Sequence, residues 1–88
     1  MRFEWDSEKA AENLRKHRVS FDEAATAFFD PLSMTVPDPD HSVGERRLTM
    51  GASSGGRLLV VAHTEGSSTL RIISARLAGA SERKRYET

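Results

Sequence analysis

Residues 70–86, LRIISARLAGASERKRY, decide how the rest of the chain is organised. The first half of this stretch is rich in isoleucine and predicts a β-strand that ends near Arg76. Gly79 interrupts the pattern, and the charged run from about Ser81 onward predicts a short helix that carries Tyr86. A strand that delivers an arginine to its own end, followed by a basic helix with a tyrosine, is suited to hold a polyanion.

The composition is typical of one small domain that spans residues 1–88. The absence of cysteine excludes disulfides and thiolate metal sites. No hydrophobic run approaches the roughly 20 residues of a membrane span, and no secretory signal follows Met1. We therefore expect a cytoplasmic protein without a membrane segment.

The formal net charge of zero conceals an asymmetry between the two halves of the chain. Residues 1–45 carry ten acidic and five basic side chains, whereas residues 46–88 carry three acidic and eight basic ones. Ten of the 13 basic residues are arginine, whose planar guanidinium suits phosphate. The basic half indicates nucleic-acid binding, although charge pairing between the two halves would explain the same pattern.

Apolar spacing predicts an opening strand, two helices and then several strands. Residues 3–5 favour a short strand, and a capped helix follows over Glu8–His17. Ser20–Glu23 has the pattern of a capping box. The apolar face that begins at Phe21 predicts a second helix of about two and a half turns, which ends before Pro31.

Runs of apolar residues bounded by turn residues predict the strands of a sheet, at 32–36, 48–50, 57–64 and 70–76. Short turns at 51–56 and 65–68 make neighbouring strands antiparallel. The sequence therefore predicts an α+β fold: two N-terminal helices packed on a four-stranded, mainly antiparallel sheet, with a short C-terminal helix. The face of the sheet away from the helices is expected to stay partly open.

The first candidate site is a set of arginines at or inside the expected strands: Arg46, Arg47, Arg57, Arg71 and Arg76. Side chains on strands have defined directions, so these arginines can present positive charge to phosphates. Arg71 and Arg76 are five positions apart and point to opposite faces unless a bulge intervenes. The alternative is that arginines at sheet edges only keep the sheet soluble.

The three histidines are candidates for acid–base chemistry near neutral pH. Their spacing matches no zinc site. His17 ends a helix, where a cation stabilises the helix dipole, and His41 lies in a polar loop. His63, on a central strand, is the best candidate for a catalytic acid or base, and a packed histidine without a catalytic role is the equal alternative.

The last helix adds Glu82 and Tyr86 on one face, with Arg83 alongside. Tyr86 either packs on the sheet or stacks on a base and transfers a proton. Gly51–Gly56 is no phosphate loop, because the lysine and helix of that motif do not follow it.

Taken together, these motifs resemble the BrnT-type toxins of bacterial type II toxin–antitoxin systems. The resemblance covers nearly the whole chain, in order. Its segments are FEWDSEKAAENLRKHRVSF at 3–21, AFFDP at 27–31, GERR at 44–47, GRLLVVAHT at 56–64, RIISAR at 71–76 and ERKRYE at 82–87. The sequence departs from the family at Arg18, where the family usually has a glycine that serves a left-handed helix cap. It also departs at Gly79, where the family often has a threonine that caps the last helix.

The resemblance implies a RelE-like fold and a metal-independent endoribonuclease that needs no cofactor and inhibits translation. It implies a small ribbon-helix-helix antitoxin of the BrnA type, through which alone the toxin meets operator DNA. By position, Arg76 and Tyr86 look like the family's catalytic residues, with His63 as a further candidate. The residues expected to bind RNA are Arg46, Arg47, Arg57, Arg71 and Arg83.

Two other functions compete with this interpretation. A non-catalytic module could hold RNA or a protein on a basic sheet face, since the sequence contains no obvious carboxylate–histidine pair. A magnesium-dependent nuclease would need the acidic residues of one loop, Asp38, Asp40 and Glu45. A chelator added to a cleavage assay separates the magnesium-dependent reaction from the others.

Overall fold

The computed structural model describes residues 2–39 and 46–87. The N-terminal part contains one strand and the first helices: β1 (Arg2–Glu4), α1 (Ser7–His17), α2 (Phe21–Thr26) and the 3-10 helix η1 (Ala27–Phe29). The remaining part contains most of the sheet and the last helix: β2 (Met34–Pro37), β3 (Arg46–Ala52), β4 (Leu58–Glu65), β5 (Thr69–Leu77) and α3 (Ala80–Glu87). Most of the predicted loop at 37–44, with His41, lies outside the described residues.

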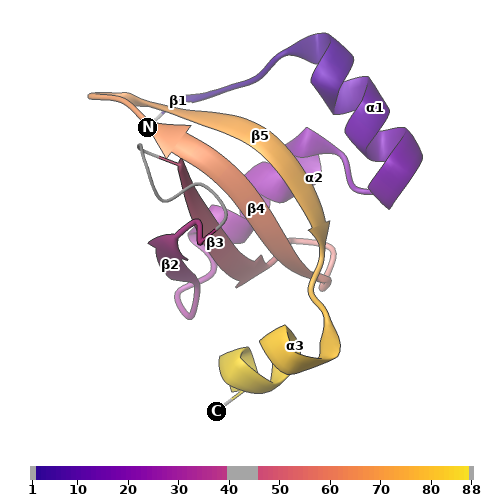
Figure 1. Ribbon diagram of the computed structural model, residues 1–88, viewed down its shortest axis with the longest axis vertical. Helices are drawn as coiled ribbons and strands as arrows, with labels where there is room; N and C mark the ends of the chain where they lie inside the picture. Colours follow the sequence, from indigo (N-terminus) through magenta and orange to yellow (C-terminus); the bar gives the residue numbers. More distant parts are fainter. Residues whose placement is uncertain (1, 40–45, 88) are drawn as a thin grey trace.

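The sheet has five strands in the order β1-β5-β4-β3-β2 (Figure 1). β2, β3, β4 and β5 form antiparallel pairs, as expected from the short turns. The prediction of a four-stranded sheet is wrong by one strand, because β1 adds to the outer edge of β5 in parallel. Parallel pairing is open to β1 because a long connection, rather than a hairpin, separates it from β5.

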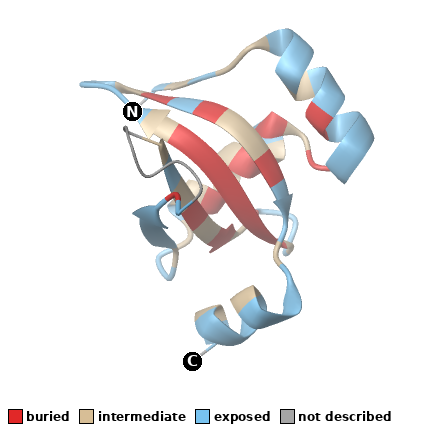
Figure 2. Ribbon diagram, viewed as in Figure 1, coloured by how far each residue is buried: buried red, intermediate tan, exposed pale blue. Residues whose placement is uncertain are grey.

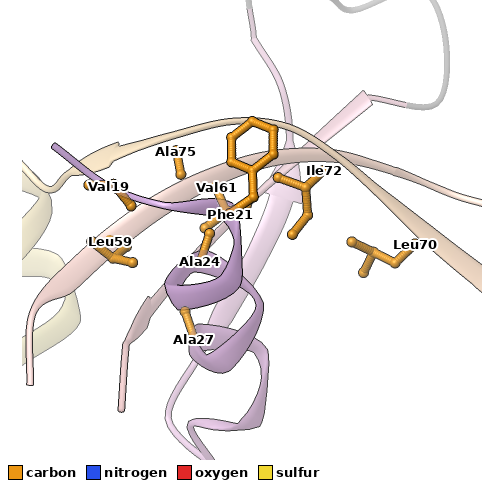
Figure 3. Packing of buried hydrophobic residues seen from close by; sticks show 9 residues of the cluster. All are labelled: Val19, Phe21, Ala24, Ala27, Leu59, Val61, Leu70, Ile72 and Ala75. Atoms are coloured by element: carbon orange, nitrogen blue, oxygen red, sulfur yellow. The ribbon is translucent and has the colours of Figure 1, made fainter. Parts of the chain in front are cut away.

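One face of the sheet carries the core. Four residues from the α1–α2 connection, α2 and η1 meet five from β4 and β5 (Figure 3): Val19, Phe21, Ala24, Ala27, Leu59, Val61, Leu70, Ile72 and Ala75. β4 is buried along most of its length (Figure 2), which confirms the prediction from its continuous apolar run. The α+β class and the two helices on one face are therefore as expected.

The second helix differs from its prediction in length. Its α-helical part ends at Thr26 and continues as one 3-10 turn to Phe29. The Thr26 hydroxyl donates to the Glu23 carbonyl at 2.6 Å, a local bond that disturbs helical geometry. β3 also crosses very close to this turn, since a Cβ on Gly51 would lie 2.5 Å from the Ala27 carbonyl oxygen. Only glycine allows this approach of two backbones.

Arg18 ends α1 in the left-handed conformation, with φ of 58° and ψ of 31°. Its amide donates to the Leu14 carbonyl at 3.0 Å and so closes the helix. The sequence departure at this position therefore falls where the backbone favours glycine.

We expect Arg18→Gly to raise the free energy of unfolding by about 0.5–1 kcal/mol, because glycine adopts this conformation without steric cost. The melting temperature should rise by about 2–8 °C in thermal unfolding. Lys16→Gly, two positions earlier and inside the helix, is the matched control and should lower stability by about 1 kcal/mol. A lower melting temperature in Arg18→Gly would mean that contacts of the Arg18 side chain stabilise the fold by more than its left-handed backbone conformation destabilises it.

Candidate functional site

Three arginines project from the face of the sheet opposite to the core. Arg46 and Arg71 both pair with Thr64 on β4. Arg76 pairs with Val60, four positions earlier on the same strand. Residues four apart on a strand face the same side, so the three arginines do as well. A register shift between β4 and β5 makes this possible, because it offsets the odd spacing of Arg71 and Arg76.

Two of the other predicted arginines lie elsewhere. Arg47 pairs with His63 and therefore belongs to the helix side of the sheet. Arg57 lies just before β4 and donates from Nε to Glu23 Oε2 at 2.9 Å and from Nη2 to the Arg18 carbonyl at 2.9 Å. It also forms an ion pair with Glu23 Oε1. Arg57 thus links the sheet to α2 through its contacts with Glu23. It lies away from the three arginines of the open face.

The contacts between Arg57 and Glu23 also alter the capping box that the sequence predicts at Ser20–Glu23. Ser20 Oγ accepts from the Glu23 amide at 3.0 Å, as expected. The Glu23 carboxylate, however, binds Arg57 and the Ser53 hydroxyl. The hydrogen bonds from Arg57 and Ser53, together with the charge of Arg57, lower the pKa of Glu23. Only the serine half of the capping box is present, because a stronger partner takes the carboxylate.

Arg76, at the end of β5, forms a two-point ion pair with Glu82 of α3. Its Nη1 and Nη2 atoms lie 2.8 Å from Oε1 and Oε2 of Glu82. Glu82 Oε1 also accepts from the Gly79 amide at 2.7 Å, which caps the start of α3. The Arg76 guanidinium and the Gly79 amide lower the pKa of Glu82 to about 2, against the opposing effect of burial. The start of α3 is therefore capped by the side chain of Glu82, a residue of the same helix, although Gly79 has no side chain that could serve as a cap.

Tyr86, one turn further along α3, donates its hydroxyl to Asp30 Oδ2, just after η1. Asp30 also accepts from the amides of Ala52 and Leu32, at 2.8 and 2.9 Å. These bonds lower the pKa of Asp30, and the carboxylate raises the pKa of Tyr86. Tyr86 is therefore a neutral phenol that points to a carboxylate.

A shallow pocket of about 170 Å³ lies between α3 and the open face of the sheet. Its lining comes from β2, β3, β4, the segment after β2 and α3: Met34, Val36, Pro39, Leu48, Met50, Val60, Glu82 and Arg85. Arg46 stands on the same face, with its Nε 3.1 Å from Asp38 Oδ2. The site is thus an apolar floor with arginines around it, and α3 forms one wall.

His63 lies on the other face and is fully buried. Its Nε2 is 2.7 Å from the Thr49 hydroxyl, and its ring packs edge-on against Phe28 at 4.9 Å between ring centroids. Burial lowers the pKa of His63, although Glu65 opposes the shift. The structure does not bring His63 together with Arg76 or Tyr86, which favours the packed, non-catalytic alternative.

The other predicted residues are at the surface. His17 is the exposed last residue of α1, and Arg83 is exposed on α3. Within residues 2–39 and 46–87, no three His, Asp or Glu side chains are grouped to hold a metal ion. In the same part of the chain, no helix is both long and apolar enough to span a bilayer.

Sequence reasoning missed three residues that organise the site: Asp30, Glu82 as the partner of Arg76, and Asn13. Asn13 is buried on α1 and bonds to both backbone groups of Ala75, next to Arg76. The sequence signal for Asn13 is an uncharged amide among the mostly charged polar residues of this helix. The sequence around Asp30 indicates only the end of a helix.

Comparison with known proteins identifies the class to which this fold and site belong. The family described as ribonuclease toxin, BrnT, of type II toxin–antitoxin system matches residues 5–82. The chain therefore belongs to the BrnT family of ribonuclease toxins, which implies an antitoxin partner. No curated protein matches the sequence.

A solved structure supports the same fold. The chain is similar to the ribonuclease toxin BrnT of Brucella abortus, with a TM-score of 0.72 and 24% sequence identity. The match covers 90% of this chain and 97% of that one. The family match ends at Glu82, so Tyr86 and the last turn of α3 lie beyond it.

Proposed function

We propose that this protein is a metal-independent endoribonuclease that inhibits translation and acts in the cytoplasm. The observation that carries the proposal is the position of Arg76, at the end of β5 in a chain of the BrnT family and on the same face as Arg46 and Arg71. Arginines on one face can hold successive phosphates of a single strand. The apolar floor beside them can accept an unstacked base.

Cleavage by transesterification needs no metal if side chains supply the charge. The 2′-oxygen of the ribose attacks phosphorus and loses its proton to solvent water, and the bond from phosphorus to the 5′-oxygen breaks. Arg76 would stabilise the negative charge that develops on the phosphorane. Tyr86 would donate its proton to the leaving 5′-oxygen and regain one from solvent. Glu82 is a poor base for the 2′-hydroxyl, since its pKa is about 2.

We further propose that the antitoxin has a ribbon-helix-helix DNA-binding domain, through which the complex binds operator DNA. A segment with apolar and acidic side chains would fit the open face, where apolar residues lie beside arginines. Phe29 and Leu77 are further exposed apolar residues, although the pairing of Leu77 with the core residue Leu59 places Leu77 on the helix side of the sheet. Inhibition would then follow from covering the same arginines that hold RNA.

Expression without a partner should arrest growth, and the purified protein should cleave single-stranded RNA equally well with and without a chelator. Co-expression of a ribbon-helix-helix protein from the adjoining reading frame should restore growth. These results follow if arginines rather than a metal stabilise the transition state. Cleavage that stops with chelator and returns with magnesium would contradict metal independence.

The non-catalytic alternative makes a different prediction in the same assay. A binding module would retain RNA on a filter at low salt but leave its length unchanged. Its affinity would fall steeply with salt, because phosphate contacts release counterions. Soluble expression with unimpaired growth and intact RNA would therefore decide for this alternative.

A further inference from the structure

Both candidate catalytic side chains are held by carboxylates of the same chain. Arg76 meets Glu82 through two parallel contacts of 2.8 Å. The Tyr86 hydroxyl donates a hydrogen bond to Asp30. The guanidinium surface that would meet a phosphodiester is thus already paired, and so is the phenol that would protonate a leaving group.

We propose that α3 is a latch that keeps the site closed, with Glu82 in the place of a phosphate on Arg76, and that binding of an RNA phosphodiester displaces it. The inference rests on the proposed function and adds regulation at the same site. Carboxylate and phosphate both accept two parallel hydrogen bonds from a guanidinium, so the two anions compete for one set of donors.

The hold on α3 is weak enough for such exchange. None of its residues is buried (Figure 2). The Arg76 and Glu82 side chains are 45% and 29% exposed, so their ion pair is partly solvated. Contact with solvent weakens such a pair, even one with two-point geometry. Segments with few buried contacts belong to the part of a protein that opens first.

The chain also has a point about which α3 can turn. Arg76 precedes Gly79, and Glu82 follows it by three residues. Opening exchanges the Glu82 contacts with Arg76 and the Gly79 amide for water, while glycine absorbs the change in backbone angles. Opening releases the Arg76 guanidinium from Glu82, so that it can bind a phosphate on the same face as Arg71 and Arg46. Because the pKa of Glu82 is about 2, its carboxylate stays ionised at any pH near neutrality. A competing anion, rather than a change of pH in that range, would therefore release Glu82 from Arg76.

The first test is the affinity for a mixed-sequence 2′-O-methyl oligoribonucleotide, which lacks the attacking hydroxyl and stays intact. Glu82→Gln should bind this probe about fivefold more tightly than the wild type, because the competing charge is removed. Glu87→Gln removes the same charge from the same helix at an exposed position and is the matched control. It should change affinity by less than about twofold. In an Arg76→Ala background, the gain from Glu82→Gln should disappear.

Equal affinity of the two variants, or weaker binding by Glu82→Gln, would overturn the latch and make Glu82 a positioning residue for Arg76. Failure of the wild type to bind the probe at all would instead overturn the proposed function, and the latch with it.

The second test measures the movement of α3. The chain has no cysteine, so nitroxide labels on Lys84→Cys and Ser54→Cys report the distance between α3 and the β3–β4 turn. Both positions are exposed. The distance distribution should shift when the probe binds and should already be broader in Glu82→Gln. A distribution that stays unchanged on saturation with the probe would overturn the opening of α3.

Discussion

Arg76→Ala should lower the rate of RNA cleavage by about 10²–10³-fold and abolish growth arrest, with the fold intact. Removing one positioned charge from a transition state costs about 2.7–4 kcal/mol. Arg76 is the penultimate residue of β5 and its side chain is half-exposed, so alanine leaves no buried cavity. The Leu77 carbonyl, which loses its bond from Nη1, is exposed to solvent. The measurement is the single-turnover cleavage rate of a defined RNA at saturating protein.

Arg71→Ala is the matched control, since Arg71 stands on the same face and pairs with Glu4 at 3.1 Å. We expect it to weaken RNA binding by a few-fold and to leave the single-turnover rate nearly unchanged, as for a phosphate contact outside the reacting centre. Arg76→Lys keeps the charge but not the two-pronged geometry and should recover only part of the rate. A folded Arg76→Ala protein that cleaves at the wild-type rate would remove Arg76 from the mechanism.

Local patterns predicted most elements of the fold because each depends on neighbours in sequence. Apolar spacing gave the two N-terminal helices, and β4 reads as a buried strand from its own residues. A short opening strand was expected near residues 3–5, but its place as a fifth strand of the sheet was not predictable in this way. Residues 2–4 are too few to specify a partner, and their pairing with Thr69–Arg71 joins opposite ends of the chain. Parallel pairing of this kind leaves no signal in either segment.

The site shows the same division between local and long-range information. The place of Arg76 at a strand end follows from the alternation around it. The face on which Arg76 lies does not, because a register shift between β4 and β5 sets it. The partners of Arg57 and Tyr86, Glu23 and Asp30, are 34 and 56 positions away. Whether an arginine binds RNA or braces a helix depends on such partners, which composition cannot reveal.

Asn13 links the stability of the fold to the position of Arg76. β1 covers the edge of β5 only at Thr69–Arg71, so the Ala75 amide and carbonyl need another partner. The Asn13 side chain accepts from this amide at 3.1 Å and donates to this carbonyl at 2.8 Å. It also donates to the Val19 carbonyl at 3.0 Å, beyond the end of α1. One buried amide thus replaces a strand at the edge of the sheet.

Asn13→Ala should therefore lower the free energy of unfolding by about 2–4 kcal/mol, because it leaves three buried backbone groups without their partner. The melting temperature should fall by on the order of 10–20 °C in thermal unfolding. Glu12→Ala, the exposed neighbour on α1, is the control and should change stability by less than about 0.5 kcal/mol. Well below the melting temperature, Asn13→Ala should still cleave RNA more slowly than the Glu12 variant, since Ala75 fixes the backbone next to Arg76.

Asn13→Asp, which can accept from the amide but cannot donate to the carbonyls at neutral pH, should be at least as unstable as alanine and recover partly on acidification. If Asn13→Ala melted within about 3 °C of the wild type, the edge of β5 would be held by its packing against α1 rather than by these bonds.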